Sequence, residues 1–261
     1  RFLLDKDTER YIEEYTQVFQ ECVELLPKQK GKSLIKITED WKRIFKYEWF
    51  RSNYRHRLLG AMNVAVCPYC NRQYISNYRQ TNEGDKKQTD TTSATADIDH
   101  FYAQNRYPFL ALSLYNFVPS CQICNSRFKI AEDFKGINPL RRGFSSDAVF
   151  QFTGVDLNLD AFDNSHPIGY ELHINKDNNG QIAESNKVFH LNDIYQSHQD
   201  YVHDLAKKIY LYQSDCGTML PMQFPQIINS AYEMQCLTFG NYLHENELGK
   251  RPLAKLTRDL L

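Results

Sequence analysis

Two C-x-x-C pairs constrain this chain more than any other feature of its sequence. The first lies in the segment CPYC and the second in the segment CQIC, and together they comprise Cys67, Cys70, Cys121 and Cys124. Each pair places two thiols on one tight turn, from which both sulfurs can bind the same metal ion. The segment between the pairs is therefore expected to fold as one unit around a shared ion.

The four cysteines predict a structural zinc site. Structural zinc is tetrahedral and is commonly bound by four thiolates, which leave no open coordination position for chemistry. The first pair encloses Pro68 in a knuckle, and the second stands where a helix is expected to begin, at SCQICNSRFK. A knuckle followed by a helix N-terminus is the treble-clef arrangement. A redox pair or four buried free cysteines are the alternatives, but the polar, turn-like CPYCNRQ disfavours the latter.

The composition sets wider limits. With 31 basic and 32 acidic residues the net charge is -1, so the basic excess typical of a stand-alone nucleic-acid binder is absent. Binding to a polyanion would have to come from local patches or from a partner. No run approaches the roughly 18 apolar residues of a membrane span, and RFLLDKDTER carries no secretion signal. Seven unevenly spaced cysteines also argue against a secreted disulfide scaffold, so we expect a cytoplasmic protein.

The chain divides into three predicted regions: residues 1–62 are helical, 63–135 carry the chemistry, and 136–261 are mixed α/β. Apolar spacing predicts helices over 5–27 and about 38–57, and the second ends in RSNYRHR. The arginines of that segment form either a solvated helix face or a phosphate-contacting patch. The three remaining cysteines lie in apolar-periodic stretches and are expected to be buried: Cys22, Cys216 and Cys236.

Strands are expected on both sides of the second cysteine pair. QYISNYRQ and TADIDHF are predicted to pair across a polar hairpin loop. Farther along, AVFQF reads as a strand, and YELHI and NKVFHL are predicted to form a second hairpin around NKDNNGQ. Two more helices are expected at roughly 194–212 and 224–247. The fold class is therefore α+β, with helices at both ends around a small ββα centre.

A group of polar residues between and beside the cysteine pairs suggests an active site. Asp99 and His100 are adjacent, and if the strand ends there both can flank one site. The aspartate is a hard oxygen ligand suited to Mg²⁺, and the imidazole can act as a general base. Asn125 directly follows Cys124, so a zinc ion at the cysteines would fix its backbone, and its amide oxygen is a second hard ligand.

The segment DIDHFYAQNRYPFLALSLYNFVPSCQICNSRFK resembles the HNH endonuclease motif in its form with two C-x-x-C zinc pairs. The motif covers about 65 residues and implies a ββα-metal (His-Me finger) core. By this resemblance His100 is the general base, Asn116 holds the loop and orients the histidine, and Asp99 and Asn125 bind one divalent metal, Mg²⁺ or Mn²⁺. Asp97 matches an acidic residue of less certain role.

The resemblance implies hydrolysis of a nucleic-acid phosphodiester by water, with DNA the favoured substrate and RNA or tRNA the alternative. Lys129 and Arg127 would hold neighbouring phosphates, although a solvated helix face is the competing interpretation of both. A zinc-stabilised module that binds nucleic acid or protein without cutting it is the competing function.

The flanking regions resemble those of a narrower group of HNH proteins. Helices before CPYC and the segment KVFHLNDIYQSHQDYVHDLAKKI resemble the HNH subunit of Septu-type anti-phage defence systems, which is also found as a retron effector. This implies a bacterial cytoplasmic nuclease that works with an ATPase of the SMC or ABC class, without membrane association. The outer helices would then dock the partner, or they simply pack around the zinc core.

Overall fold

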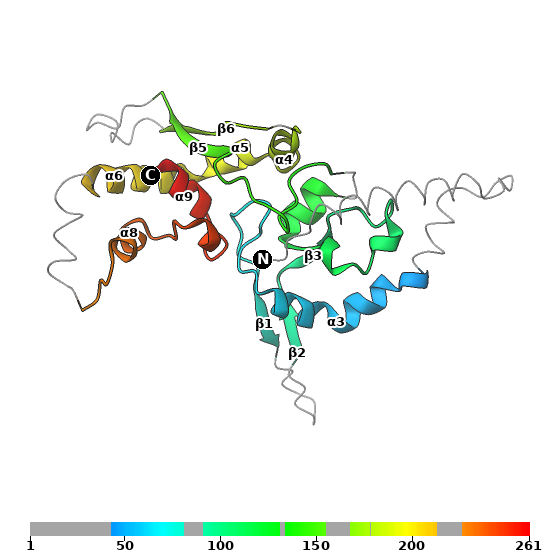
Figure 1. Cartoon of the computed structure of the whole chain (residues 1–261). Coiled ribbons are helices and arrows are strands. Elements are labelled where there is room, and N and C mark those ends of the chain that lie inside the picture. The colour runs from blue at the N-terminus through cyan, green and yellow to red at the C-terminus, as the bar shows by residue number, and fades with distance from the viewer. Residues whose placement is uncertain (1–42, 81–90, 131–133, 155–167, 178, 213–225) are drawn as a thin grey trace. The chain divides into compact units, whose positions relative to one another are not determined.

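The computed structural model describes residues 43–80, 91–130, 134–154, 168–177, 179–212 and 226–261. Within these ranges the chain is α+β, as predicted, and its strands form three separate two-stranded antiparallel sheets (Figure 1). It divides into two compact units, one of residues 1–64 and 75–143 and the other of residues 65–74 and 144–261. The sequence predicts a different division, into residues 1–62, 63–135 and 136–261, and that division stays a prediction.

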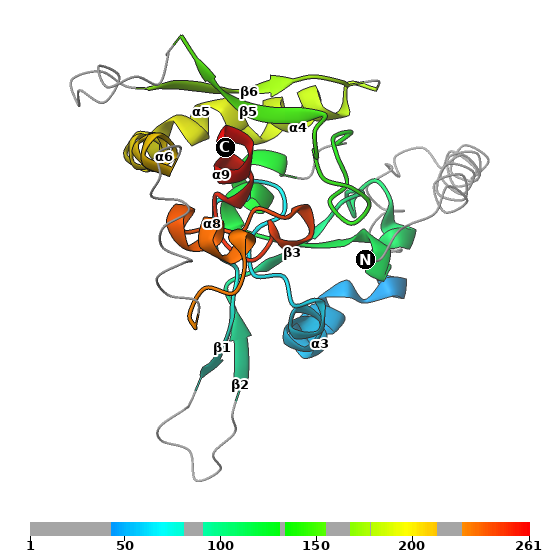
Figure 2. The ribbon, with the colours of Figure 1, turned by 60° about the vertical axis from the view of Figure 1, so that its left-hand side comes forward.

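The described residues of the first unit contain one long helix, two short sheets and several single-turn segments. Its elements are α3 (Tyr47–Met62), β1 (Asn77–Gln80), β2 (Thr91–Ala94), β3 (Asp97–His100), η1 (Pro108–Leu110), η2 (Leu114–Asn116), β4 (Phe117–Ser120) and the π-type helix η3 (Ile123–Lys129). The hairpin β1–β2 pairs Asn77 with Ala94, and α3 lies against it (Figure 2). The sheet β3–β4 pairs Asp97 with Ser120 and His100 with Phe117.

The expected hairpin of this unit is confirmed only in part. The strand that returns to β1 is Thr91–Ala94, which lies in the segment predicted as the loop, and the chain is then interrupted at Thr95 and Ala96, the first residues of TADIDHF. The residues after the interruption form β3, which leaves the hairpin and pairs with β4 instead. The interruption therefore turns the strand that carries His100 toward the segment that leads to Cys121.

The second unit is built on the sheet β5 (Ala148–Thr153) and β6 (Gly169–Ile174). Its helices are α4 (Gln181–Phe189), α5 (Leu191–Tyr195), η5 (Gln196–His198), α6 (Gln199–Leu211), α8 (Ala231–Phe239), η7 (Glu245–Glu247) and α9 (Ala254–Leu260). The helix α9 packs on β5 and α5 on β6. The ring of Phe150 packs 4.5 Å from that of Tyr195, so the sheet and α5 share one apolar core.

The predicted hairpin of YELHI with NKVFHL is wrong. YELHI does form β6, but its partner is AVFQF in β5, and NKVFHL lies in α4 and the start of α5. The helix arises because Ile182, Ser185 and Phe189 recur at helical spacing and are all buried. The Asp177 carboxylate also accepts a hydrogen bond from Ala183 N–H at 2.8 Å, in the helix's first turn.

The other predicted helices are confirmed with changed bounds. The helix expected over 38–57 is helical at 43–45 and continues as α3 to Met62, whereas the one expected over 5–27 lies outside the described residues. The region 194–212 holds the end of α5, η5 and α6. In 224–247 the helix α8 stops at Gly240, whose φ of 72° is left-handed. No described helix has both the length and the apolar surface needed to cross a bilayer.

Candidate metal centre and active site

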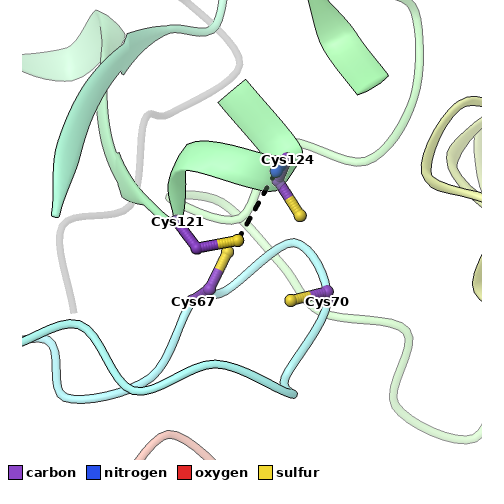
Figure 3. A group of neighbouring side chains, drawn as sticks. All are labelled: Cys67, Cys70, Cys121 and Cys124. Atoms are coloured by element: carbon purple, nitrogen blue, oxygen red, sulfur yellow. Dashed lines mark hydrogen bonds between the residues drawn. The ribbon is translucent and has the colours of Figure 1, made fainter. Parts of the chain in front are cut away.

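The four cysteines of the two C-x-x-C pairs lie together, as predicted (Figure 3). All are buried and free of disulfides, and their sulfurs lie within 4.8 Å of one another. Zinc–sulfur bonds of about 2.3 Å in a tetrahedron place the sulfurs roughly 3.8 Å apart, so small movements would bring all four onto one ion. The donor set fits structural zinc. Cys236, half-buried, lies outside this cluster.

The knuckle of the first pair is held by the helices of its own unit. The backbone bond from Asn71 N–H to Cys67 O, at 2.8 Å, closes the turn, and Asn71 itself has a left-handed φ of 49°. The hydroxyl of Tyr195 donates to Cys70 O at 2.7 Å. Between the two ligands, the ring of Tyr69 stacks on Phe189 with centroids 4.6 Å apart. The knuckle backbone is thus positioned before any metal binds.

The strand β3 sends its polar side chains to two faces. The strand ends at His100, as expected, but His100 still pairs with Phe117, so its side chain and that of Asp99 point to opposite faces. Because strand side chains alternate, Asp97 and Asp99 share one face while Ile98 and His100 share the other. The face with the aspartates is the one that meets η3.

Asp99 is buried in an ion pair with Lys129. The ammonium lies 3.1 Å from Asp99 Oδ1, and the two side chains are 4% and 1% exposed. Lys129 Nζ also donates to His100 O at 2.6 Å. Burial lowers the pKa of Lys129, while the Asp99 carboxylate acts in the opposite direction. Lys129 was predicted to hold a neighbouring phosphate, but its ammonium is internal here; Arg127, with the same predicted role, is exposed.

Asp97 and Asn125 lie beside each other at a more open position. Asn125 Nδ2 donates to Asp97 Oδ2 at 3.3 Å, and both residues are partly exposed. Arg55 of α3 donates to Asp97 Oδ1 at 3.3 Å and also to Ala96 O. Rotation of the Asn125 amide by 180° would present its oxygen to the space that its nitrogen now faces. The structure therefore brings Asn125 to Asp97, two residues before the aspartate that the motif pairs with it.

His100 is positioned by a backbone carbonyl and by aromatic rings. Its Nε2 lies 3.0 Å from Ala111 O, a contact in which this nitrogen must carry the proton. The rings of Tyr47 and Phe117 meet it edge-on, with centroids 4.5 and 5.2 Å away. Burial lowers the pKa of His100, so the imidazole is neutral near pH 7. With Nε2 donating, the basic nitrogen is Nδ1.

Asn116 fastens the loop that supplies this carbonyl. Its side chain is buried, its Oδ1 accepts from Tyr102 N–H at 2.7 Å, and its Nδ2 donates to Tyr102 O and Leu110 O at 3.1 and 3.2 Å. Leu110 precedes Ala111, the partner of His100. Asn116 thus holds the loop directly and the histidine indirectly, in agreement with the role that the motif implies.

Two side chains of α3 contact the candidate active site and were not predicted from the sequence. Tyr47 packs on His100, and Arg55 bonds to Asp97. Both lie more than 40 residues before the strand they contact, and the only available signal was the arginine-rich end of the helix. Comparison with known proteins adds nothing to this geometry: no protein-family model, no curated protein and no solved structure matches the chain.

Proposed function

We propose that this chain is a metal-dependent endonuclease of the HNH type, with a ββα-metal core formed by β3, β4 and η3. The observation that carries the proposal is the placement of a neutral histidine on one face of β3 and of carboxylates with an asparagine on the other. In-line displacement at phosphorus needs a base on the side of the attacking water and charge neutralisation on the side of the leaving oxygen. His100 is the last residue of β3, so a phosphate bound at that end of the strand would meet the base and the metal ligands together.

The residues that would hold the catalytic ion are oxygen donors, which favour Mg²⁺ or Mn²⁺ over softer metals. Asp97 and Asn125 are adjacent and partly exposed, and they fit the ion once the Asn125 amide is rotated by 180° and Arg55 releases Asp97. Asp99, the ligand implied by the motif, joins them only if Lys129 releases it. When bound, the ion would neutralise charge on the phosphate and on the leaving 3′ oxygen.

The residues of the chain itself prepare the nucleophile. His100 Nδ1 takes a proton from water, while Nε2–H stays bonded to Ala111 O and fixes the ring orientation. Its pKa, lowered by burial, keeps the imidazole in the neutral form that this step requires. Asn116 preserves the geometry of the loop, and exposed Arg127 is available to a neighbouring phosphate.

The test is cleavage of supercoiled plasmid with Mg²⁺ or Mn²⁺. His100→Ala should lower the rate by a factor of about 10² to 10⁴, the usual contribution of a general base, and leave the zinc content unchanged. The matched control is His203→Ala, on α6 in the other unit, which should cleave like the native chain. Full activity of His100→Ala would refute the assignment.

Two other functions are separated by the same experiment. A zinc-stabilised binding module would bind nucleic acid equally well after His100→Ala and would show no metal-dependent cleavage at all. An RNA or tRNA nuclease would cut RNA and spare plasmid, because attack by water needs no 2′-hydroxyl and works on either polymer. The neutral His100 beside metal-ligand side chains favours hydrolysis over simple binding.

We further propose, from the resemblance of the flanks alone, that the nuclease is the effector of an anti-phage defence complex with an ATPase of the SMC or ABC class. A net charge of -1 is consistent with dependence on a partner for capture of the polyanion. Co-purification of the tagged native chain from its own cells tests this, with an ATPase as the expected partner. Recovery of the chain without any ATPase would contradict it.

A further inference from the structure

We propose that the exposed face of α3 binds a single-stranded stretch of nucleic acid, with an unpaired base stacked on Trp49 and Tyr54. This rests on the proposed function, because it names the form of substrate that the candidate active site receives. The helix spans 16 residues, yet among them only Tyr47 and Leu59 are buried. Most of its surface is therefore open to a ligand.

The aromatic pair is unusually exposed for its size. Trp49 is 59% exposed and Tyr54 39%, and their ring centroids lie 5.5 Å apart at an interplanar angle of 59°. Large rings left in water lose the stabilisation that burial would give them. Aromatic side chains on such surfaces are platforms for nucleobases, because every base presents a π-face.

Positive charge surrounds this pair. The helix carries three arginines against a single glutamate, in a chain whose net charge is -1. Arg51 and Arg57 each stand three residues from Tyr54, a spacing that places them beside it on the helix surface. Both are exposed, and the 3.7 Å contact of Arg51 with Glu48 is a solvated pair that contributes little. The charge is complementary to phosphates next to a stacked base.

The same helix touches the candidate active site. Tyr47, at its start, packs on His100, and Arg55, two turns later, is bonded to Asp97. A strand bound to α3 would therefore lie on the element that also contacts the residues proposed to cut it. A duplex keeps its bases stacked internally and offers no free face to Trp49, whereas an unpaired base does. This favours single-stranded nucleic acid, or a locally unpaired junction, over intact duplex.

The first experiment uses tryptophan fluorescence. The chain has two tryptophans, Trp41 and Trp49, so the variant Trp41→Phe/His100→Ala reports on Trp49 alone and does not cut. It is titrated, without added Mg²⁺, with a 15-nucleotide oligo(dT) and with the blunt oligo(dA)·oligo(dT) duplex of equal length. Saturable quenching by the single strand and weaker binding of the duplex are expected. Duplex binding as tight as that of the single strand would overturn the proposal.

The second experiment measures affinity by anisotropy of a labelled oligo(dT) in the His100→Ala background. Trp49→Ala should weaken binding roughly 5- to 150-fold, the range of one base–aromatic stack, while Trp49→Phe should stay close to native. Arg51→Ala should reduce the slope of log affinity against log salt by about 0.7. The control Leu237→Ala changes a side chain as exposed as Trp49, on α8 of the other unit, and should have no effect.

The possible outcomes distinguish this proposal from the nuclease assignment on which it rests. Native affinity of Trp49→Ala for oligo(dT) refutes the platform, and the face is then open to a protein partner instead. Plasmid cleavage by the native chain and its loss in His100→Ala decide the nuclease assignment independently. The Trp49→Ala variant could keep both metal-dependent cleavage and native oligo(dT) binding. That result would refute the stacking platform and support the nuclease assignment.

Discussion

At the scale of single residues, the pair of Asp99 and Lys129 determines how the proposed metal site can work. A carboxylate that is 4% exposed and bonded to an ammonium is not available to a cation. Asp97, on the same face of the strand, is more open and already lies beside Asn125. The motif pairs Asp99 with the asparagine as metal ligands. In the structure Asp97 lies beside Asn125 instead, and Asp99 anchors η3 to β3.

Lys129→Met should lower the free energy of unfolding by about 3–5 kcal/mol, because it removes the ammonium that is ion-paired with the buried Asp99 carboxylate. Asp99→Asn/Lys129→Met should recover most of that loss, since neither charge remains. Urea denaturation measures both, with Lys135→Met, an exposed lysine of the same unit, as the control. A loss within about 0.5 kcal/mol for Lys129→Met, as at an ordinary surface position, would contradict the burial.

Lys129 also shows why residue roles were harder to predict than residue positions. A basic residue four positions after Asn125 was foreseeable from the motif, but its burial depends on how η3, a π-type helix, packs against β3. Nothing in ICNSRFK distinguishes a π-type from an α-type turn. Similarly, His100 donates to the backbone carbonyl of Ala111. Any residue type supplies a backbone carbonyl, so the sequence cannot indicate this contact.

At the scale of elements, strong local patterns predicted well and pairings across distance did not. The two C-x-x-C pairs predicted the cysteine cluster because their chemistry permits few other arrangements. YELHI and NKVFHL were each apolar and lay beside a turn-rich segment, which suggested a hairpin. The second segment lies in helix α4 and the start of α5, and the partner of β6 is β5, more than ten residues before it in the chain, a pairing that local patterns do not reveal.

The helices of the second unit contact the CPYC knuckle, and a substitution at Tyr195 tests whether these contacts stabilise the metal site. Tyr195→Phe removes only the hydroxyl that donates to Cys70 O at 2.7 Å and leaves the ring in the core. Because partners of metal ligands commonly contribute 10- to 100-fold to metal affinity, zinc should be lost to a chromophoric chelator about tenfold faster. The control Tyr201→Phe removes a hydroxyl bonded to Thr257 in the same unit. Equal release rates in the two variants would exclude this support.

At the scale of the whole molecule, the cysteine cluster and the candidate active site are joined through the chain. Cys70 and Cys121 bracket the strands β1 to β4, which include both aspartates and His100, and Asn125 follows Cys124 directly. A metal bound by all four thiolates closes this long loop. Binding free energy of this kind is also folding free energy, about 10–16 kcal/mol for structural zinc in small peptides.

Removal of zinc should therefore disable more than the metal site. We expect one zinc per chain by mass spectrometry, and either a strong chelator or Cys121→Ser should lower the melting temperature and abolish cleavage together. Cys236→Ser, outside the cluster, should change neither. His100→Ala should keep its zinc and its fold and lose cleavage, with a melting temperature lowered by the lost packing on Tyr47 and Phe117. A chelated chain that still melts at the native temperature would show that the four thiols hold no structural ion. The geometry of the segment between the cysteine pairs would then be maintained by protein contacts such as those of Asn116 and the Lys129–Asp99 ion pair.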